Sequence, residues 1–352
     1  MAKTDTVKIG VIGAGNIGKH HIGCYQKVPG VQVVAVADPV LGAAEAAAKQ
    51  FNIANVFGCH KDMLEKVEMD GVSVCTPNAF HAPQTVDALK AGKNVLCEKP
   101  MSTTVREAEA MVKAAKESKK LLMLGFVRLF DSGVEVVKKY LDDGQLGQVY
   151  HSVVFEVRRR GIPGLGGWFT TKKMSGGGPL IDIGVHALYS TVYMMGSPEP
   201  VAVSASCYSK FGSRKPYVYV GMWGSPVPGG TFDVEDYASA LIRFENGATC
   251  TLECAWAANA GGGSFVHILG DKAGLKWEGG NITFYGENEG YLTDFVPQYA
   301  KGDAFVAQMR HYADCIRGEA VCRCPGEYGL MIQKILNGVY DSSKANKEVR
   351  IS

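Results

Sequence analysis

Two polar side chains, Asp182 and His186, interrupt the apolar end of the segment Gly176–Tyr189, GGGPLIDIGVHALY. Residues four apart on a helix share one face, so a helix here would present a carboxylate and an imidazole to one small volume. With an ordinary pKa of about 6.5, an imidazole is suited to general-base catalysis at neutral pH. The preceding glycines would leave room for a bound ring. Considered alone, the pair is better explained by a structural hydrogen bond, and the rest of the sequence favours the catalytic interpretation.

A dinucleotide-binding pattern lies near the N-terminus. The apolar strand expected at Val7–Ile12 runs directly into a complete G-x-G-x-x-G, formed by Gly13–Gly18. A second apolar strand, Val31–Ala37, ends at Asp38, at the spacing of about 20 residues that is typical of the motif's acidic partner. Because the glycines follow a strand, open a helix and have this acid beyond them, the pattern indicates a Rossmann unit.

Each part of this pattern has a physical role. Gly13 permits the tight turn, Gly15 lets the backbone approach a pyrophosphate, and Gly18 lets helix and strand pack closely. The N-terminus of the following helix would face the phosphates. Asp38 would accept hydrogen bonds from the ribose hydroxyls and repel a 2′-phosphate, and no lysine or arginine follows it directly. The pattern therefore favours NAD over NADP. The neighbouring His20 and His21 are expected to be packing or surface residues.

Strands and helices alternate up to residue 125. The expected elements are a helix at Ala43–Phe51, a strand at Gly71–Cys75, a helix at His81–Ala91, a strand at Asn94–Cys97, a helix at Val105–Ser118 and a strand at Leu121–Gly125. Such alternation predicts a parallel α/β sheet, whose ligands bind beyond the carboxyl ends of the strands. Two polar loops leave those ends, Thr76–His81 (TPNAFH) and Cys97–Pro100 (CEKP). Residues 1–125 are thus expected to form an NAD-binding Rossmann domain.

The pattern changes after Gly125, and residues 126–352 are expected to form an α+β domain with a large, mostly antiparallel sheet. A helix at Val134–Leu141 precedes this sheet, and two helices, Ala304–Arg317 and Glu327–Ala345, close the chain. The last helix is a candidate to pack back on the first domain. The expected strands are Val149–Arg159, Val201–Ser209, Glu235–Phe244, Thr249–Ala257, Phe265–Leu269, Leu275–Glu278 and Ile282–Tyr285.

The glycine-rich loop, the TPNxxH segment, the strand ending in CEKP and the later GGGPLIDIGVH together resemble the Gfo/Idh/MocA family of NAD(P)-dependent oxidoreductases. The similarity covers nearly the whole chain, and the C-terminal YGLMIQKILNGVYDSSKANKEVRI resembles the closing helix and strand of that family. Lys99 matches the family's active-site lysine, and its bond to Pro100 is expected to be cis. Asn78 and Glu98 would line the nicotinamide side. The residues expected to bind the cofactor are Gly13, Gly15, Asn16, Ile17, Gly18, Asp38, Thr76, Asn78, His81, Glu98 and Lys99.

The family implies hydride transfer between NAD and a secondary alcohol carbon of a sugar, glycoside or cyclic polyol. His186 would be the general base, Lys99 would stabilise negative charge on the reacting oxygen, and Asp182 would orient the substrate. The RRRGIP and GGGPLIDIGVH context resembles family members that oxidise glucosides or anhydrosugars at ring position 3. The residues expected to bind substrate are Lys99, Arg128, Arg158, Trp168, Asp182 and His186.

Several of these assignments have open alternatives. Arg128 could reach substrate or form a salt bridge across the domain boundary, and Trp168 could stack on a sugar or belong to the core. The segment Arg158–Gly164 could clamp an anion, although alternation on a strand would point neighbouring arginines to opposite faces. The long loop Gly212–Gly230 could cover the substrate or contact another subunit.

Three functions other than a dehydrogenase are compatible with parts of this sequence. One is a glycosidase or epimerase that uses tightly bound NAD in a transient oxidation. Another is a non-catalytic NAD-dependent sensor or regulator, which would not need Lys99, Asp182 and His186 together. The third is a metal enzyme with Asp182 and His186 as ligands, for which the sequence offers no convincing third and fourth ligand. No metal is therefore expected.

Composition limits the partners and the compartment. The formal net charge of +2 gives no electrostatic reason to expect nucleic acid, and no apolar run approaches the length that crosses a membrane. The ten cysteines form no C-x-x-C pair, and most lie in apolar runs, so reduced, buried thiols are expected. We expect a cytoplasmic enzyme with a small carbohydrate or polyol substrate. In this family the outer face of the second sheet is commonly a subunit interface, which implies a homodimer or homotetramer.

Overall fold

The computed structural model describes residues 6–351 and divides the chain into two compact units. The first unit runs to Phe130 and also includes Asp303–Leu330. The second comprises Asp131–Gly302 and the chain from Met331 onward. The sequence placed the division at residue 125, and it did not assign the segment Asp303–Leu330 to the first unit.

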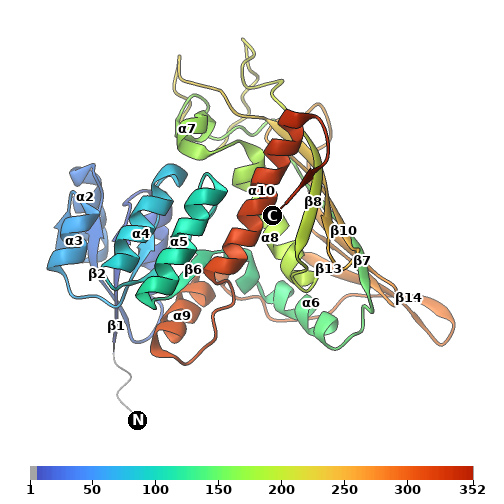
Figure 1. Ribbon diagram of the computed structural model, residues 1–352, viewed down its shortest axis with the longest axis horizontal. Coiled ribbons are helices and arrows are strands. Elements are labelled where there is room, and N and C mark those ends of the chain that lie inside the picture. The colour runs from blue at the N-terminus through green and yellow to red at the C-terminus, as the bar shows by residue number, and fades with distance from the viewer. Residues whose placement is uncertain (1–5, 352) are drawn as a thin grey trace. The chain divides into compact units, whose positions relative to one another are not determined.

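The first unit is built on a parallel sheet of six strands in the order β3-β2-β1-β4-β5-β6 (Figure 1). This is the strand order of a Rossmann fold, in which the order reverses between β1 and β4. The predicted Rossmann fold is therefore confirmed. Its strands are β1 (Val7–Ile12), β2 (Val31–Ala37), β3 (Asn55–Phe57), β4 (Gly71–Val74), β5 (Asn94–Glu98) and β6 (Leu122–Gly125). Its helices are α1 (Asn16–Tyr25), α2 (Leu41–Phe51), α3 (His60–Lys66), α4 (His81–Lys90), α5 (Val105–Ser118) and α9 (Ala304–Arg317).

Local signals explain where several of these helices begin and end. The side chain of Thr104 accepts the backbone N–H of Glu107 at the start of α5, and the Glu107 carboxylate accepts the N–H of Thr104 in return, a capping box. Asp303 caps α9 in a similar way, and Gly318 ends that helix in the left-handed conformation with φ of +75°. The short elements β3 and α3 were not predicted, because three strand residues and seven helix residues carry little periodic signal.

The second unit is built on a sheet of nine strands in the order β14-β13-β12-β11-β7-β10-β9-β8-β15. All neighbours are antiparallel except β7 and β10, so the prediction of a mostly antiparallel sheet is confirmed. The strands are β7 (Val149–Val157), β8 (Pro200–Tyr208), β9 (Tyr237–Phe244), β10 (Thr249–Ala255), β11 (Gly263–Gly270), β12 (Gly274–Glu278), β13 (Asn281–Asn288), β14 (Tyr291–Phe295) and β15 (Val349–Arg350). The helices are α6 (Ser132–Asp142), α7 (Lys172–Ser175), α8 (Val185–Met194) and most of α10 (Gly326–Ala345).

The two faces of this sheet have different surroundings. Ser152 and Val154 of β7 are fully buried, and the Ser152 hydroxyl lies 3.1 Å from the sulfur of Met195, which follows α8. Since side chains alternate along a strand, Val153 and Phe155 must lie on the opposite face. Helix α8 therefore covers the inner face, and the other face is left partly exposed.

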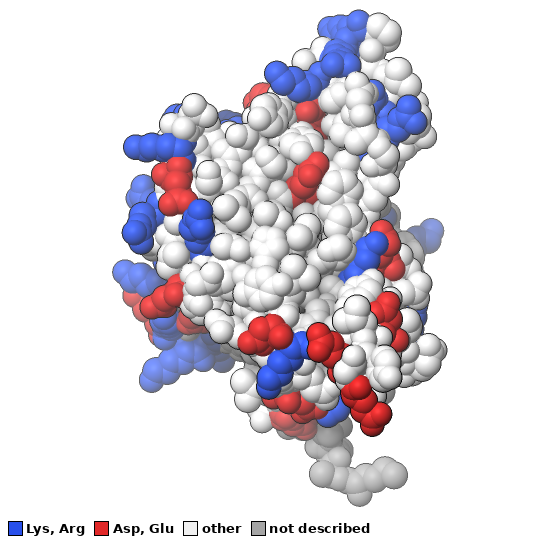
Figure 2. All heavy atoms as spheres, turned by 90° about the vertical axis from the view of Figure 1, so that its right-hand side faces the viewer, with Lys and Arg blue, Asp and Glu red and all other residues white. Residues whose placement is uncertain are grey.

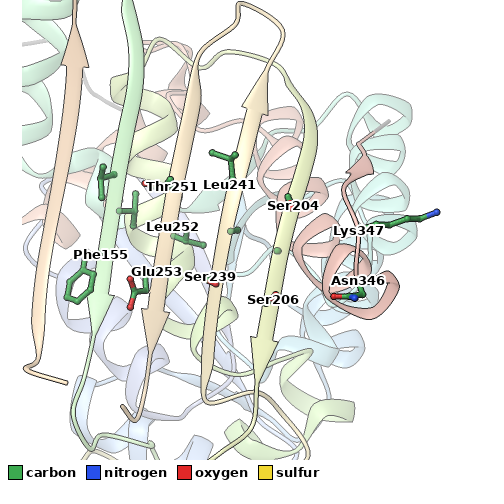
Figure 3. Close-up of a pocket in the computed structure, with 14 residues that line it drawn as sticks. Phe155, Ser204, Ser206, Ser239, Leu241, Thr251, Leu252, Glu253, Asn346 and Lys347 are labelled. Carbon is green, nitrogen blue, oxygen red and sulfur yellow. The ribbon is translucent and has the colours of Figure 1, made fainter. Parts of the chain in front are cut away.

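The exposed face of the sheet carries few charges. Figure 2 shows it as a broad field without lysine, arginine, aspartate or glutamate over most of its area, with charged side chains gathered mainly around the margin. A shallow pocket lies on this face (Figure 3), lined among others by Phe155, Ser239, Leu241, Thr251 and Glu253. Its lining includes neither Asp182 nor His186. The pocket is therefore a feature of the sheet surface rather than of the predicted catalytic segment.

None of the helices formed by residues 6–351 combines the length and apolarity required to cross a bilayer. All ten cysteines are free, and six of them are buried. Burial raises the pKa of Cys97 to about 12 and that of Cys250 to about 11, so these two residues behave as small apolar side chains.

Candidate active site

The glycine-rich loop of the first unit has the geometry of a dinucleotide cradle. Gly13 has φ of +99°, and a Cβ atom there would come within 2.7 Å of the carbonyl oxygen of Cys75. A Cβ at Gly18 would lie 1.9 Å from the carbonyl oxygen of Gly13, so only glycine permits this close turn. Around Gly15, by contrast, a Cβ would meet no atom within 4 Å. The loop therefore packs tightly against protein atoms at Gly13 and Gly18 and leaves open space at Gly15.

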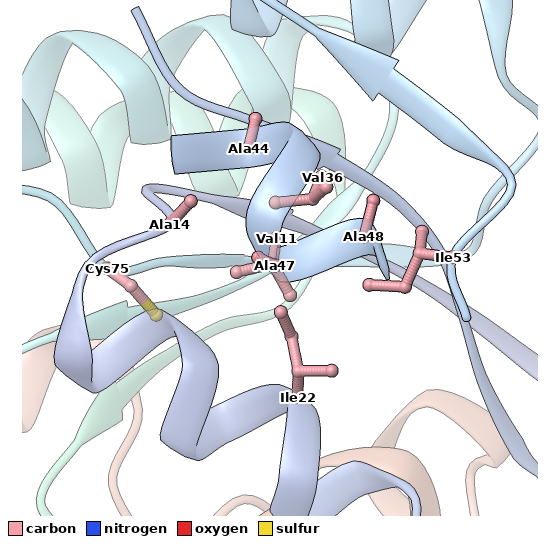
Figure 4. Close-up of a cluster of buried hydrophobic side chains, with 9 residues drawn as sticks. All are labelled: Val11, Ala14, Ile22, Val36, Ala44, Ala47, Ala48, Ile53 and Cys75. Carbon is pink, nitrogen blue, oxygen red and sulfur yellow. The ribbon is translucent and has the colours of Figure 1, made fainter. Parts of the chain in front are cut away.

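A small-residue core holds the loop in place. Ala14 and Cys75 belong to a buried cluster with Val11, Ile22 and Val36 (Figure 4). Three alanines of α2 complete one side of the cluster, and their short side chains allow that helix to lie close to the sheet. The packing of this cluster therefore positions the backbone of the loop and leaves its N–H groups available to bind an anion.

Asp38 lies at the end of β2, beside the loop. Its Oδ2 accepts the backbone N–H of Ala14 at 2.8 Å, and its Oδ1 accepts that of Val40 at 2.8 Å. Each carboxylate oxygen can accept a further hydrogen bond, as ribose hydroxyls would require. Val40 and Leu41, two and three residues after Asp38, have exposed apolar side chains. The open glycine, the acid and this apolar surface together fit the phosphate, ribose and base of a dinucleotide.

A buried pair that the sequence did not reveal connects α1 with the CEKP loop. The Nε2 atom of His21 lies 2.9 Å from Oε1 of Glu98, and its Nδ1 lies 3.4 Å from the sulfur of Cys75. His21 is fully buried, and Glu98 is 7% exposed. The interpretation of His21 as a packing or surface residue was incomplete, because its partners lie more than fifty residues away along the chain and leave no local signal.

Glu98 is held in the charged form. Burial by itself would raise its pKa, but the hydrogen bond and charge of His21, the charge of Lys99 and the Lys99 backbone N–H together lower the pKa below its usual value. Gly125 on β6 makes room for this carboxylate, since a Cβ there would lie 2.7 Å from Oε1. The Lys99–Pro100 bond is cis, as expected, and the Lys99 side chain is partly buried.

His81 connects the two polar loops of the first unit. Its Nδ1 lies 2.7 Å from the carbonyl oxygen of Pro100, and its Nε2 lies 2.8 Å from that of Thr76. The ring is 1% exposed, and both nitrogens face protein carbonyls, so His81 positions these loops. Thr76 donates its hydroxyl to Gln84, and Asn78 is buried in the short 3₁₀ turn before α4.

In the second unit, the glycines before Asp182 make room for protein atoms rather than for a ligand. A Cβ at Gly177 would lie 1.9 Å from the Tyr340 hydroxyl, and a Cβ at Gly178 would lie 2.0 Å from the carbonyl oxygen of Glu235. The hypothesis that these glycines leave space for a substrate ring is therefore wrong for Gly177 and Gly178. Glu235 could not be connected with this segment from the sequence, because it lies more than fifty residues farther along the chain.

The segment with Asp182 is not a regular α-helix. Leu180–Gly184 forms a π-helical turn, and α8 begins only at Val185. The carboxylate of Glu235 accepts the backbone N–H groups of Gly178 and Leu180 and the hydroxyl of Tyr340, so a side chain supplies partners at the start of the turn. Burial raises the pKa of Glu235. The prediction of one continuous helix face for Asp182 and His186 must be corrected accordingly, since a π turn is wider than an α turn.

Asp182 and His186 each have a defined neighbour. The buried carboxylate of Asp182 accepts a hydrogen bond from the indole N–H of Trp256, which is fully buried, at 3.0 Å. Nδ1 of His186 lies 3.0 Å from the hydroxyl of buried Tyr189. Tyr189 could have been found from the sequence because it lies one helical turn after His186, whereas Trp256 follows a distant strand. Lys99 belongs to the first unit, and Asp182 and His186 belong to the second.

The three consecutive arginines have three different environments. Strand β7 ends at Val157, so the expectation that Arg158 and Arg159 lie on the strand is wrong. A guanidinium nitrogen of Arg158 lies 3.8 Å from the Met222 sulfur, and Arg159 is exposed. Arg160 donates to the carbonyls of Arg159 and Ala258 and to Asn259. Arg160 is therefore a structural residue. The fourth arginine considered from the sequence, Arg128, lies in the first unit, in the 3₁₀ turn Val127–Phe130.

The long loop Gly212–Gly230 lies on the segment that contains Trp168. The backbone N–H of Gly164 donates to the carbonyl of Trp223, and that of Val227 donates to the carbonyl of Leu165. The ring of Phe169 contacts those of Trp168 and Trp223, with centroid distances of 3.6 and 4.4 Å. Trp168 is partly buried in this aromatic cluster.

Among the described residues, a single group of three potential metal ligands is close enough to share an ion, and it consists of His311, Cys315 and Cys322. Neither Asp182 nor His186 belongs to it. This group could not be predicted from the sequence, because its ligands are not arranged as C-x-x-C pairs.

Two family profiles match the chain. The profile described as "Oxidoreductase family, NAD-binding Rossmann fold" matches residues 7–126, and "GFO/IDH/MocA C-terminal domain" matches residues 134–276. The D-glucoside 3-dehydrogenase of Escherichia coli K12 is 33% identical over 98% of this chain and 97% of its own length. The levoglucosan dehydrogenase of Pseudarthrobacter phenanthrenivorans is 30% identical over 70% of this chain and 67% of its own length.

A solved structure supports the fold. The crystal structure of an oxidoreductase domain protein from Kribbella flavida superposes with a TM-score of 0.87, covering 99% of this chain and 100% of that one. The sequences are 24% identical, so the superposition supports the fold alone.

The position of His81 predicts a loss of stability in mild acid. Burial lowers the pKa of this imidazole, although its contacts with the carbonyls of Pro100 and Thr76 act in the opposite sense. The unfolded chain, with a histidine pKa of about 6.5, binds the proton first as the pH falls. His81 therefore contributes stability above about pH 6.5 that is lost toward pH 5, by at most about 2 kcal/mol.

Urea unfolding at pH 7 and pH 5 measures this contribution. The variant His81→Gln should lose less stability between the two pH values than the wild type. The matched change His20→Gln, at an exposed histidine, should leave the difference unchanged. An equal pH dependence in His81→Gln and the wild type would contradict the assignment.

Proposed function

Because this chain belongs to the Gfo/Idh/MocA family of NAD-binding oxidoreductases, we propose that it oxidises a secondary hydroxyl of a sugar, glycoside or cyclic polyol to a ketone. The observation that carries this proposal is the similarity, along nearly the whole length of both chains, to a D-glucoside 3-dehydrogenase. The hydroxyl at ring position 3 of a glucoside is therefore the preferred candidate. The levoglucosan dehydrogenase relative supports a sugar-ring substrate independently.

NAD is the proposed cofactor, and it would supply the hydride acceptor when bound. The open backbone at Gly15, with Asn16 and Ile17 at the start of α1, would hold the pyrophosphate. Asp38 would hold the ribose and disfavour NADP by charge repulsion. Thr76, Asn78, Glu98 and Lys99 complete the proposed set in the first unit, and His81 would act by positioning the loops that carry them.

His186 is the proposed general base. With Nδ1–H donating to the hydroxyl of Tyr189, the ring would accept the substrate hydroxyl proton at Nε2. Tyr189 is buried in α8, so this bond would also fix the orientation of the ring. The base would then be charged when the ketone forms, and the reverse reaction would return the same proton to the carbonyl oxygen.

Lys99 and Asp182 would handle the charges around the reacting oxygen. The Lys99 ammonium would donate a hydrogen bond to that oxygen and stabilise its developing negative charge. Asp182, with its carboxylate held by the Trp256 indole, would accept a hydrogen bond from a neighbouring substrate hydroxyl. Trp256 is therefore a positioning residue in this mechanism. Arg128, Arg158 and Trp168 are proposed as further substrate contacts.

We also propose that a second copy of the chain covers the outer face of the nine-stranded sheet. This face is broad and largely uncharged, and partly exposed Phe155 and Leu241 lie on it (Figures 2 and 3). Uncharged faces of this kind are typical of interfaces between subunits. A dimer or a dimer of dimers would satisfy this constraint.

The catalytic assignment is tested by measuring NADH formation with glucosides, levoglucosan and inositols. His186→Gln should lower kcat about 10²- to 10⁴-fold, because the general base is lost. Lys99→Met should lower kcat about 10²- to 10³-fold, because one stabilising donor is lost. His151→Gln and Lys90→Met, at positions outside the proposed set, should retain wild-type turnover. Normal turnover of the His186 or Lys99 variant would refute the role proposed for that residue. Consumption of a glycoside with no accumulation of either ketone or free NADH would indicate transient oxidation instead.

The cofactor preference depends on the charge of Asp38. The variant Asp38→Asn keeps one acceptor oxygen for a loop N–H group but removes the charge that repels a 2′-phosphate. We expect the ratio of kcat/KM for NAD to that for NADP to fall about tenfold or more, which corresponds to at least about 1.4 kcal/mol. Steady-state kinetics with both cofactors measures the ratio. Equal use of NAD and NADP by the wild type would contradict the proposal.

The proposed subunit interface is tested by light scattering after size-exclusion chromatography. Leu241→Glu places an unpaired charge on the uncharged face and should shift the protein to a smaller assembly. The control Val321→Glu introduces the same charge at a side chain of the first unit that is 92% exposed. It should leave the mass of the assembly unchanged. An unchanged mass for Leu241→Glu would place the interface elsewhere.

A further inference from the structure

A compact group of three metal-ligating side chains lies in the first unit, at the end of α9. His311 and Cys315 are four residues apart on this helix, so their side chains share one face. Gly318 then reverses the chain in the left-handed conformation, which brings Cys322 back toward the same face. One ring nitrogen of His311 and the sulfurs of Cys315 and Cys322 all lie within 4.8 Å of one another. All three residues are partly buried.

The distances are close to those of a zinc site. With Zn–S bonds of about 2.3 Å and Zn–N bonds of about 2.0–2.1 Å, tetrahedral geometry requires S···N separations of about 3.6 Å and S···S separations of about 3.8 Å. The observed distance from the Cys315 sulfur to Nε2 of His311 is 3.5 Å. One edge of the tetrahedron is therefore already formed, and side-chain shifts of about 1 Å suffice for the others.

The histidine is also in the tautomer that a metal requires. Its Nε2 accepts the backbone N–H of Arg323 at 3.0 Å, so the ring hydrogen of a neutral imidazole must be on Nδ1. The ring of His311 packs against that of Phe130 at 5.2 Å, which restricts its rotation. Metal binding would exchange the hydrogen bond from Arg323 for a coordinate bond at the same nitrogen.

We propose that His311, Cys315 and Cys322 form a site for a divalent cation of the zinc type, with the fourth position open to water. Two thiolates and one imidazole are the ligands that zinc and cobalt prefer over hard cations such as magnesium. Both thiols must release their protons on binding, and the two resulting negative charges balance those of the cation. No residue of this group has a role in the proposed dehydrogenase mechanism.

The site would stabilise a segment that joins the edge of the Rossmann sheet. The carbonyl of Cys324 accepts the backbone N–H of Leu124 on β6, and its thiol donates to the carbonyl of Leu124 at 3.2 Å. A metal that holds Cys322 to α9 would fix this segment between the helix and the strand. Bound cation should therefore raise the unfolding temperature of the protein.

Titration of the reduced, metal-free full-length protein with Co²⁺ tests the proposal. We expect one equivalent to bind, with the ultraviolet charge-transfer absorption of two thiolates, the visible bands of tetrahedral cobalt, and displacement by Zn²⁺. Cys315→Ser and Cys322→Ser should each weaken binding about 100-fold or more, beyond the effect typical of an outer-shell change. His311→Gln, which leaves both thiols in place, should weaken it while retaining the thiolate absorption.

The matched control is Cys59→Ser, which removes an exposed thiol and should bind cobalt as the wild type does. Circular dichroism of each variant separates loss of the site from loss of the fold. Binding of wild-type strength in both cysteine variants would overturn the proposal. Failure of the reduced wild type to bind cobalt would also overturn the proposal. This holds even if hydrogen peroxide, itself reduced to water, oxidises the two thiols of that protein to a Cys315–Cys322 disulfide.

Discussion

The carboxylate of Glu235 is buried and accepts hydrogen bonds from Gly178, Leu180 and Tyr340. Burying a carboxylate that accepts no hydrogen bonds costs much free energy. The carboxylate therefore favours the backbone conformation in which its donors reach it. The same constraint acts at Glu98 with His21, and at Asp182 with Trp256. In both units, the segments that carry the proposed catalytic residues are held by acids whose donors come from distant parts of the chain.

The sequence predicted what depends on local spacing. The glycine-rich loop and the longer helices and strands have short-range signals, and helices α5 and α9 begin and end where expected. The short elements β3 and α3 and the strand β14 were not predicted. The π turn at Leu180–Gly184 could not be predicted in this way. It depends on Glu235, and no local periodicity records a contact across more than fifty residues.

The glycines of the two units differ in role, because distant parts of the chain determine the space around each one. At Gly15 a side chain would enter open space, so the absence of a side chain there suits a ligand. At Gly177 and Gly178 a side chain would collide with Tyr340 and with the backbone of Glu235, so its absence suits the fold. A glycine-rich sequence shows only that something must approach the backbone closely, and the distant chain decides whether that is substrate or protein.

The long loop Gly212–Gly230 is held at its base by a buried acid in a similar way. Buried Asp236 accepts the backbone N–H groups of Lys210, Phe211 and Gly212, at the base of the long loop. The guanidinium groups of Arg160 and Arg214 lie 4.4 and 4.3 Å from the ring centroid of Phe211. The base of the loop is thus fixed by hydrogen bonds to the buried side chain of Asp236 and by cation–π contacts, while its outer side chains, such as Trp223, are exposed. Changes in those outer side chains can alter the surface of the loop without disturbing the anchor that holds it.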